Sequence, residues 1–98
     1  MAFVHIDISV RGFTEAETRS GLSDLLGEFQ HRQWLFRPIA VWDAARSCLV
    51  IGIDYEGQDT EVCGQAVLDE VRDCVVACIQ SASDIHLEVD DSRFTSAA

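Results

Sequence analysis

The chain has 98 residues, of which 48% are hydrophobic and 24% charged, a composition typical of one folded domain. Seventeen acidic residues against seven basic ones give a net charge of -10, and the resulting field repels nucleic-acid phosphates and anionic lipids. We therefore expect neither nucleic acid nor a membrane as a partner. The first residues lack the pattern of a signal peptide, and no apolar run reaches the roughly 18 residues of a membrane span, so we expect a cytoplasmic protein.

The N-terminal third predicts a strand followed by a helix. Residues 3–10 alternate between apolar and polar side chains, as in a half-buried strand. Thr14 and Glu17 have the spacing of a capping box, so a helix should begin there and end near His31. The apolar residues of this helix share one face because they follow i, i+3, i+4, i+7 spacing: Leu22, Leu25, Leu26 and Phe29.

The middle of the chain predicts a hairpin. Two apolar stretches, residues 35–42 and 48–55, are joined by a short loop. Pro38 lies in the first stretch, and it cannot donate a ladder hydrogen bond. This strand should therefore lie at an edge of its sheet.

The C-terminal part predicts a second helix and a last strand. Asp59 or Thr60 can cap a helix that runs to about Ser81. Residues 85–90 alternate again, and the polar segment 92–98 should fray, which leaves residues 1–91 as the single domain. The buried stripe of the second helix should contain Cys63, Val67, Val71, Cys74, Val75 and Cys78.

The order strand, helix, strand, strand, helix, strand is that of the split βαβ plan. We therefore expect an α+β, ferredoxin-like βαββαβ two-layer sandwich. Right-handed crossovers give it a four-stranded antiparallel sheet of order 4-1-3-2, with both helices on one face. This plan serves many functions, so it predicts no chemistry by itself.

The cysteines are better explained as core residues than as ligands or disulfides. Cys74 and Cys78 alternate with valines on the helix stripe, where a free cysteine behaves as a small apolar residue. Cys63 and Cys74 are about 16 Å apart along a helix, too far for a disulfide. Motifs for a catalytic serine, a phosphate-binding loop or a zinc protease are absent. We therefore expect no cofactor and no bound metal.

The uncovered face of the sheet should carry a polar cluster. In antiparallel neighbours of this register, Ser9 lies near His86, Asp7 near Glu88 and His5 near Asp90, to within one pair, and Asp54 can approach His5. Four interpretations of this cluster are open: a solvated surface, a weak metal site, an acid–base pair and a docking surface. Its predicted binding residues are His5, Asp7, Asp54, His86, Glu88 and Asp90.

The other half of the same face should be apolar and form an interface. A weak two-fold homodimer through this patch, or through the edge strand with Pro38, is expected. The predicted interface residues are Phe36, Ala40, Trp42 and Val50.

Two hypotheses for function follow. The leading one is a small, acidic, non-enzymatic interaction or regulatory module acting through the open sheet face, such as an immunity-type inhibitor of a basic protein. The alternative is a metal-binding protein or a small enzyme that uses the histidine and carboxylate cluster on that face. The sequence favours the first because it holds no catalytic motif.

Overall fold

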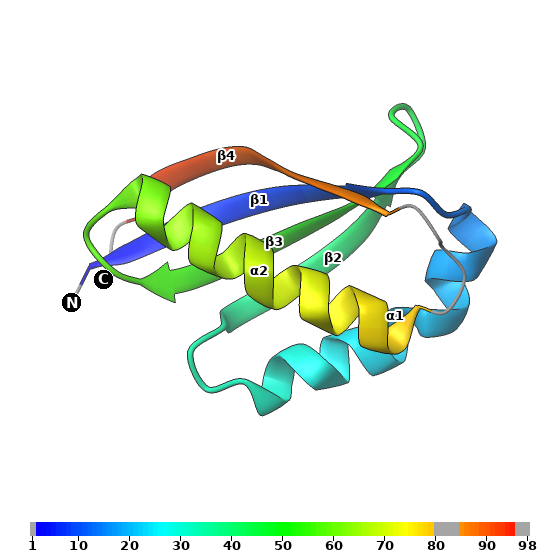
Figure 1. The fold of residues 1–98 in the computed structure, drawn as a ribbon, viewed down its shortest axis with the longest axis horizontal. Helices are drawn as coiled ribbons and strands as arrows, with labels where there is room; N and C mark the ends of the chain where they lie inside the picture. The colour runs from blue at the N-terminus through cyan, green and yellow to red at the C-terminus, as the bar shows by residue number, and fades with distance from the viewer. Residues whose placement is uncertain (1, 80–84, 96–98) are drawn as a thin grey trace.

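Six elements form a two-layer sandwich in a computed structural model, which describes residues 2–79 and 85–95. The sheet has the order β2-β3-β1-β4 with every pair antiparallel, and both helices lie on one face (Figure 1). The predicted ferredoxin-like fold is confirmed, and β2, which contains Pro38, is an edge strand. The elements are β1 (Phe3–Arg11), α1 (Glu15–His31), β2 (Phe36–Asp43), β3 (Cys48–Glu56), α2 (Thr60–Cys78) and β4 (His86–Thr95).

Both helices begin where the sequence predicts. The Thr14 hydroxyl accepts from the Glu17 backbone N–H at 3.2 Å, and the Glu17 carboxylate accepts from the Thr14 N–H at 2.7 Å. At α2, the Asp59 carboxylate accepts from the Val62 N–H at 3.0 Å. Such caps satisfy backbone donors that have no partner inside the helix. α2 ends at Cys78, and the expected end at Ser81 lies outside the described residues.

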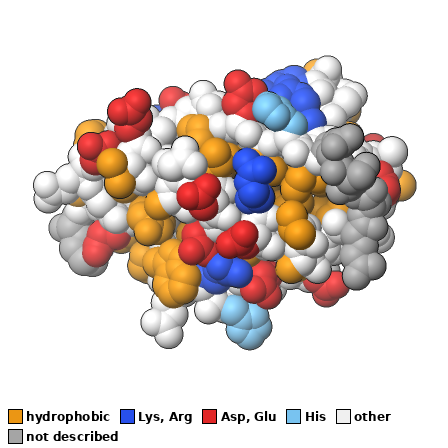
Figure 2. Space-filling view, in the orientation of Figure 1, with side chains coloured by type: hydrophobic (Ala, Val, Ile, Leu, Met, Phe, Trp, Pro, Cys, Tyr) orange, Lys and Arg blue, Asp and Glu red, His pale blue; other side chains and the backbone are white. Residues whose placement is uncertain are grey.

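The core lies between the sheet and the helices. The inward side chains of β1 are Val4, Ile6, Ile8 and Val10, and each is completely buried. Cys63 and Cys74 are buried on the α2 stripe and Cys78 is partly buried, all as free thiols. Charged and apolar side chains are interspersed over the helix-covered side (Figure 2). No helix in the described parts of the chain is long and apolar enough to cross a membrane.

A bulge in β2 reverses part of the predicted face. The pairing of β2 with β3 shifts between Phe36 and Ile39, and Arg37 there has a φ of 48°. Beyond the bulge, Ala40 and Trp42 pack against the core on the helix side. Ile39 and Val41 point outward instead, with 58% and 57% of their surface exposed.

The prediction that placed Ala40 and Trp42 on the open face is therefore wrong. The prediction assumed that side chains alternate between the two faces without interruption through Arg37. The bulge adds one residue, which moves every later side chain of β2 to the other face. Phe36 and Val50 do belong to the open face, since they pair with Asp54 and Val41.

The last strand also differs from the prediction. A bulge in β4 pairs Ile8 with Val89 but Asp7 with Asp91, which leaves Asp90 as the extra residue. Hence His5 faces Arg93 rather than Asp90. Ser9 faces Glu88 and Arg11 faces His86, one pair away from the expected register. β4 continues through Thr95, so residues 92–95 are paired and do not fray, while 96–98 lie outside the described residues.

Candidate functional site

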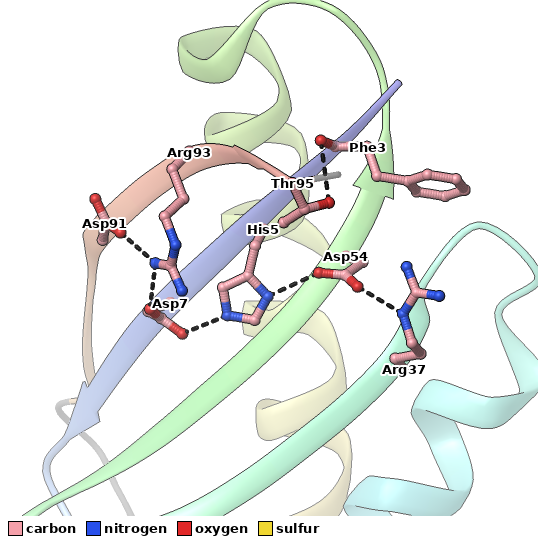
Figure 3. Close-up of polar contacts among 8 residues, drawn as sticks. All are labelled: Phe3, His5, Asp7, Arg37, Asp54, Asp91, Arg93 and Thr95. Atoms are coloured by element: carbon pink, nitrogen blue, oxygen red, sulfur yellow. Dashed lines mark hydrogen bonds and ion pairs between the residues drawn. The ribbon is translucent and has the colours of Figure 1, made fainter. Parts of the chain in front are cut away.

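The open face of the sheet holds a histidine between two carboxylates (Figure 3). His5 lies on β1, and its Nδ1 is 2.7 Å from Asp54 Oδ1 on the neighbouring β3. Its Nε2 is 2.9 Å from Asp7 Oδ1, two residues along the same strand. Side chains two apart on a strand point to the same face, which is why β1 supplies both His5 and Asp7.

Two arginines complete this arrangement. Arg37 Nε donates to Asp54 Oδ2 at 2.7 Å. Arg93 Nη1 donates to Asp7 Oδ2 at 3.2 Å and also bonds Asp91, so the cation bridges two carboxylates that face each other across β1 and β4. Such like charges repel unless they are screened. We call the six residues the His5 network: Asp91, Arg93, Asp7, His5, Asp54 and Arg37.

The hydrogen bonds define the protonation chemistry of the network. A neutral imidazole donates a hydrogen bond from one nitrogen only, whereas an imidazolium donates from both. A ring that lies between two carboxylates can therefore donate to both of them only in its cationic form. Burial pushes the pKa of Asp54 upward, but the hydrogen bonds from Arg37 and His5 outweigh it, and the pKa lies below its ordinary value. Asp54 is thereby held as an anion on Nδ1.

Two backbone features shape the network, and sequence reasoning missed both. Gly52 on β3 lies opposite Asp7, and a Cβ there would come within 3.2 Å of His5 Cε1 and of Asp7 Oδ1. The glycine therefore leaves the room that the imidazole occupies. The β2 bulge places Arg37 in the left-handed region, which is unfavourable for a side chain other than glycine. A glycine inside a strand pattern was the one readable signal.

The predicted binding residues separate into two groups. His5, Asp7 and Asp54 come together as described. Asp90 lies beside them and accepts hydrogen bonds from Arg46 Nη1 at 2.9 Å and from Ser9 Oγ at 3.0 Å. The bond from Arg46 lowers the pKa of Asp90 although burial opposes it.

His86 and Glu88 are not part of the network. Both lie near the start of β4, where Glu88 is 3.8 Å from Arg11. The two arginines of the network were missed because one lies in the β2 bulge and the other in the segment that was expected to fray. Among the described residues, no three His, Cys, Asp or Glu side chains are placed to share a metal ion.

A shallow hollow of about 610 Å³ adjoins the network. One of its walls is Asp7, so a molecule in the hollow would contact the carboxylate that is bonded to His5 Nε2. The other walls combine apolar side chains with one cation and two further carboxylates: Val41, Trp42, Ala44, Val50, Arg46, Asp43 and Asp90.

Comparisons with known proteins give little beyond the fold. No protein-family model matches the chain. No curated protein matches it either. A solved structure that it resembles is the crystal structure of a putative antibiotic biosynthesis monooxygenase from Bordetella bronchiseptica. The two chains are 17% identical over 90% of this chain and 96% of that one, with a TM-score of 0.49.

The leading functional hypothesis, a non-enzymatic interaction module on the open face, is wrong and is withdrawn, because the open face differs from the one that it required. Ala40 and Trp42 pack against the core, and the polar half of the face is occupied by internal ion pairs. The weak homodimer, the basic partner and the cytoplasmic location stay predictions.

Proposed function

We propose that the protein is a small enzyme that moves protons to and from a substrate bound in the hollow beside Asp7. The observation that carries the proposal is the double role of Asp7, which accepts a hydrogen bond from His5 Nε2 and also lines the hollow. An oriented imidazole and carboxylate in reach of a bound molecule is the arrangement that general acid–base catalysis requires.

Each member of the network has a defined role in this proposal. Asp54 is kept ionised by Arg37 and holds the proton on His5 Nδ1, which fixes the tautomer. Nε2 is then the nitrogen that exchanges a proton with Asp7. In the acid direction the Nε2 proton passes to Asp7, and Asp7 gives a proton to the substrate. In the base direction both transfers run backwards.

The walls of the hollow indicate the kind of substrate. Val41 and Val50 favour an apolar body, while Arg46 is the cation on the same wall. A carbon acid with an aromatic or alkyl group and a carbonyl suits this lining, because removing a proton beside the carbonyl develops negative charge that a cation stabilises. The metal-binding form of the alternative hypothesis receives no such support from the described residues.

The test is hydrogen–deuterium exchange of carbon acids in D₂O, followed by proton NMR with acetylacetone and a series of aryl ketones. The native protein should accelerate exchange of at least one compound. His5→Gln and Asp7→Asn should each reduce that acceleration by about 10²- to 10⁴-fold, the usual contribution of a general acid or base. His86→Gln is the matched control, because His86 is an exposed histidine of the same sheet outside the network.

Two results would contradict the proposal. One is a native protein that accelerates no compound in the series. The other is an equal loss in His5→Gln and His86→Gln. Circular dichroism and urea unfolding of every variant separate a lost proton relay from a lost fold.

A further inference from the structure

The start of β2 and the end of β3 lie at the same end of the sheet (Figure 1). A second hollow lies there. It has a volume of about 400 Å³ and is separate from the hollow beside Asp7. Its lining consists of three aromatic side chains, one amide and one carboxylate: Trp34, Phe36, Tyr55, Gln33 and Glu56.

Two of these aromatic rings lie at the surface, one just before β2 and one at its first residue. Leu35 is 5% exposed and packs in the core, and its N–H donates to the Arg32 carbonyl at 3.1 Å. With Leu35 anchored, its neighbours Trp34 and Phe36 remain 47% and 39% exposed. Large aromatic side chains left in water beside a concave surface are a common feature of ligand sites.

The charge around these rings favours a cation over a neutral ligand. Glu56 is an exposed carboxylate in the lining, and none of the described lining residues is basic. The whole chain carries -10, which attracts cations. Aromatic faces bind cations through their quadrupoles, and several rings together recognise alkylated ammonium groups.

The same end of the sheet already holds one cation on an aromatic ring. The Arg37 guanidinium lies 5.5 Å from the centroid of Phe3, and Phe3 contacts Phe36 edge to face at 5.3 Å. Arg37 is bonded to Asp54 and does not line the hollow. Of the three rings in the lining, Trp34 is the most exposed, at 47%, whereas Tyr55 is partly buried against the core.

We propose that this hollow binds an alkylated ammonium group, with Trp34, Phe36 and Tyr55 contacting the alkyl groups and Glu56 balancing the charge. The inference does not depend on the proton-transfer function, because no residue of the His5 network lines this hollow.

The test compares choline with 3,3-dimethylbutanol, which has the same shape without the charge. Each is titrated into the native protein, and the indole N–H signals of the two tryptophans are followed by NMR. Choline should shift the Trp34 signal in a saturable way and leave Trp42 unchanged. The neutral compound should bind at least about fivefold more weakly, since cation–aromatic attraction is absent.

Variants assign the contacts. Trp34→Ala should abolish the saturable binding of choline, measured through the backbone amide of Glu56, whereas Trp34→Phe should retain part of it. Glu56→Gln should weaken choline binding by several fold and leave 3,3-dimethylbutanol unaffected. Glu88→Gln, which removes an exposed carboxylate at the start of β4, is the charge-matched control and should change neither.

Equal affinity for choline and 3,3-dimethylbutanol would overturn the proposal and indicate a purely apolar hollow. Equal effects of Glu56→Gln and Glu88→Gln would overturn it as well. The preference for a cation would then come from the net charge of the protein and not from Glu56. An unchanged Trp34 signal at saturating choline would rule out the site itself.

Discussion

Replacing Gly52 with alanine tests how closely the sheet is fitted to the His5 network. The new Cβ would lie 3.2 Å from His5 Cε1 and from Asp7 Oδ1, and 3.1 Å from Ile39 Cγ1, so each neighbour must move by a few tenths of an ångström. Overpacking of this kind costs about 1–3 kcal/mol. The substitution also removes the entropic cost of glycine in a strand, roughly 0.5–1 kcal/mol. We expect a net loss of about 1 kcal/mol in the free energy of unfolding, within a range of about 0–2.5 kcal/mol.

A double-mutant cycle identifies the group responsible. Ile39 is exposed and can turn away, and Asp7 can relax once the imidazole is gone, so the crowding depends on His5. In a His5→Ala background, Gly52→Ala should therefore become neutral or stabilising, by up to about 1 kcal/mol. Urea unfolding of the four proteins measures both effects. The same loss of stability in both backgrounds would refute the idea that Gly52 makes room for the imidazole.

Three further predictions follow from the described residues. The folded pKa of Asp54 lies below its unfolded value, so its stabilising contribution is present above about pH 4 and is lost as the pH falls through the folded pKa. Asp54→Asn should therefore reduce the loss of stability between pH 4 and lower pH in a series of urea-unfolding measurements. An unchanged loss would contradict the pairing of Asp54 with Arg37 and His5. Burial raises the pKa of Cys74 to about 11, so at pH 8 this thiol should react with a disulfide reagent far more slowly in the native protein than in urea, and equal rates would place it at the surface. If the weak homodimer forms through the open face, sedimentation should show association that strengthens with salt and is lost in Val41→Arg, while a monomer at high protein and salt concentration would exclude it.

The elements and their order followed from local signals in the chain. A capping box at Thr14, alternation through residues 3–10 and the apolar stripe of α2 are patterns that short-range geometry imposes, so a single sequence reveals them. Pro38 correctly indicated an edge strand because the missing N–H is a property of the residue itself. The proximity of His5 and Asp54 was also foreseen, since two apolar strands of known topology leave few registers.

The composition of the site depended on tertiary pairing. A bulge depends on how two strands pair, so the residues of β2 alone did not predict that Arg37 would have a φ of 48°. They also did not predict that Trp42 would pack against the core. Likewise, Arg93 joins the site only because β4 stays paired with β1 through Thr95.

The sequence by itself thus determined which segments become helices and strands, how they are capped and which face of each is apolar up to the first bulge. Only the tertiary structure decided which charges meet. A shift of one residue in pairing moves a side chain to the other face, and that choice is made by contacts between segments 49 and 88 residues apart, such as His5 with Asp54 and His5 with Arg93. For the same reason, the sequence around Gly52 does not show that the missing side chain leaves room for the imidazole of His5, which comes from another strand.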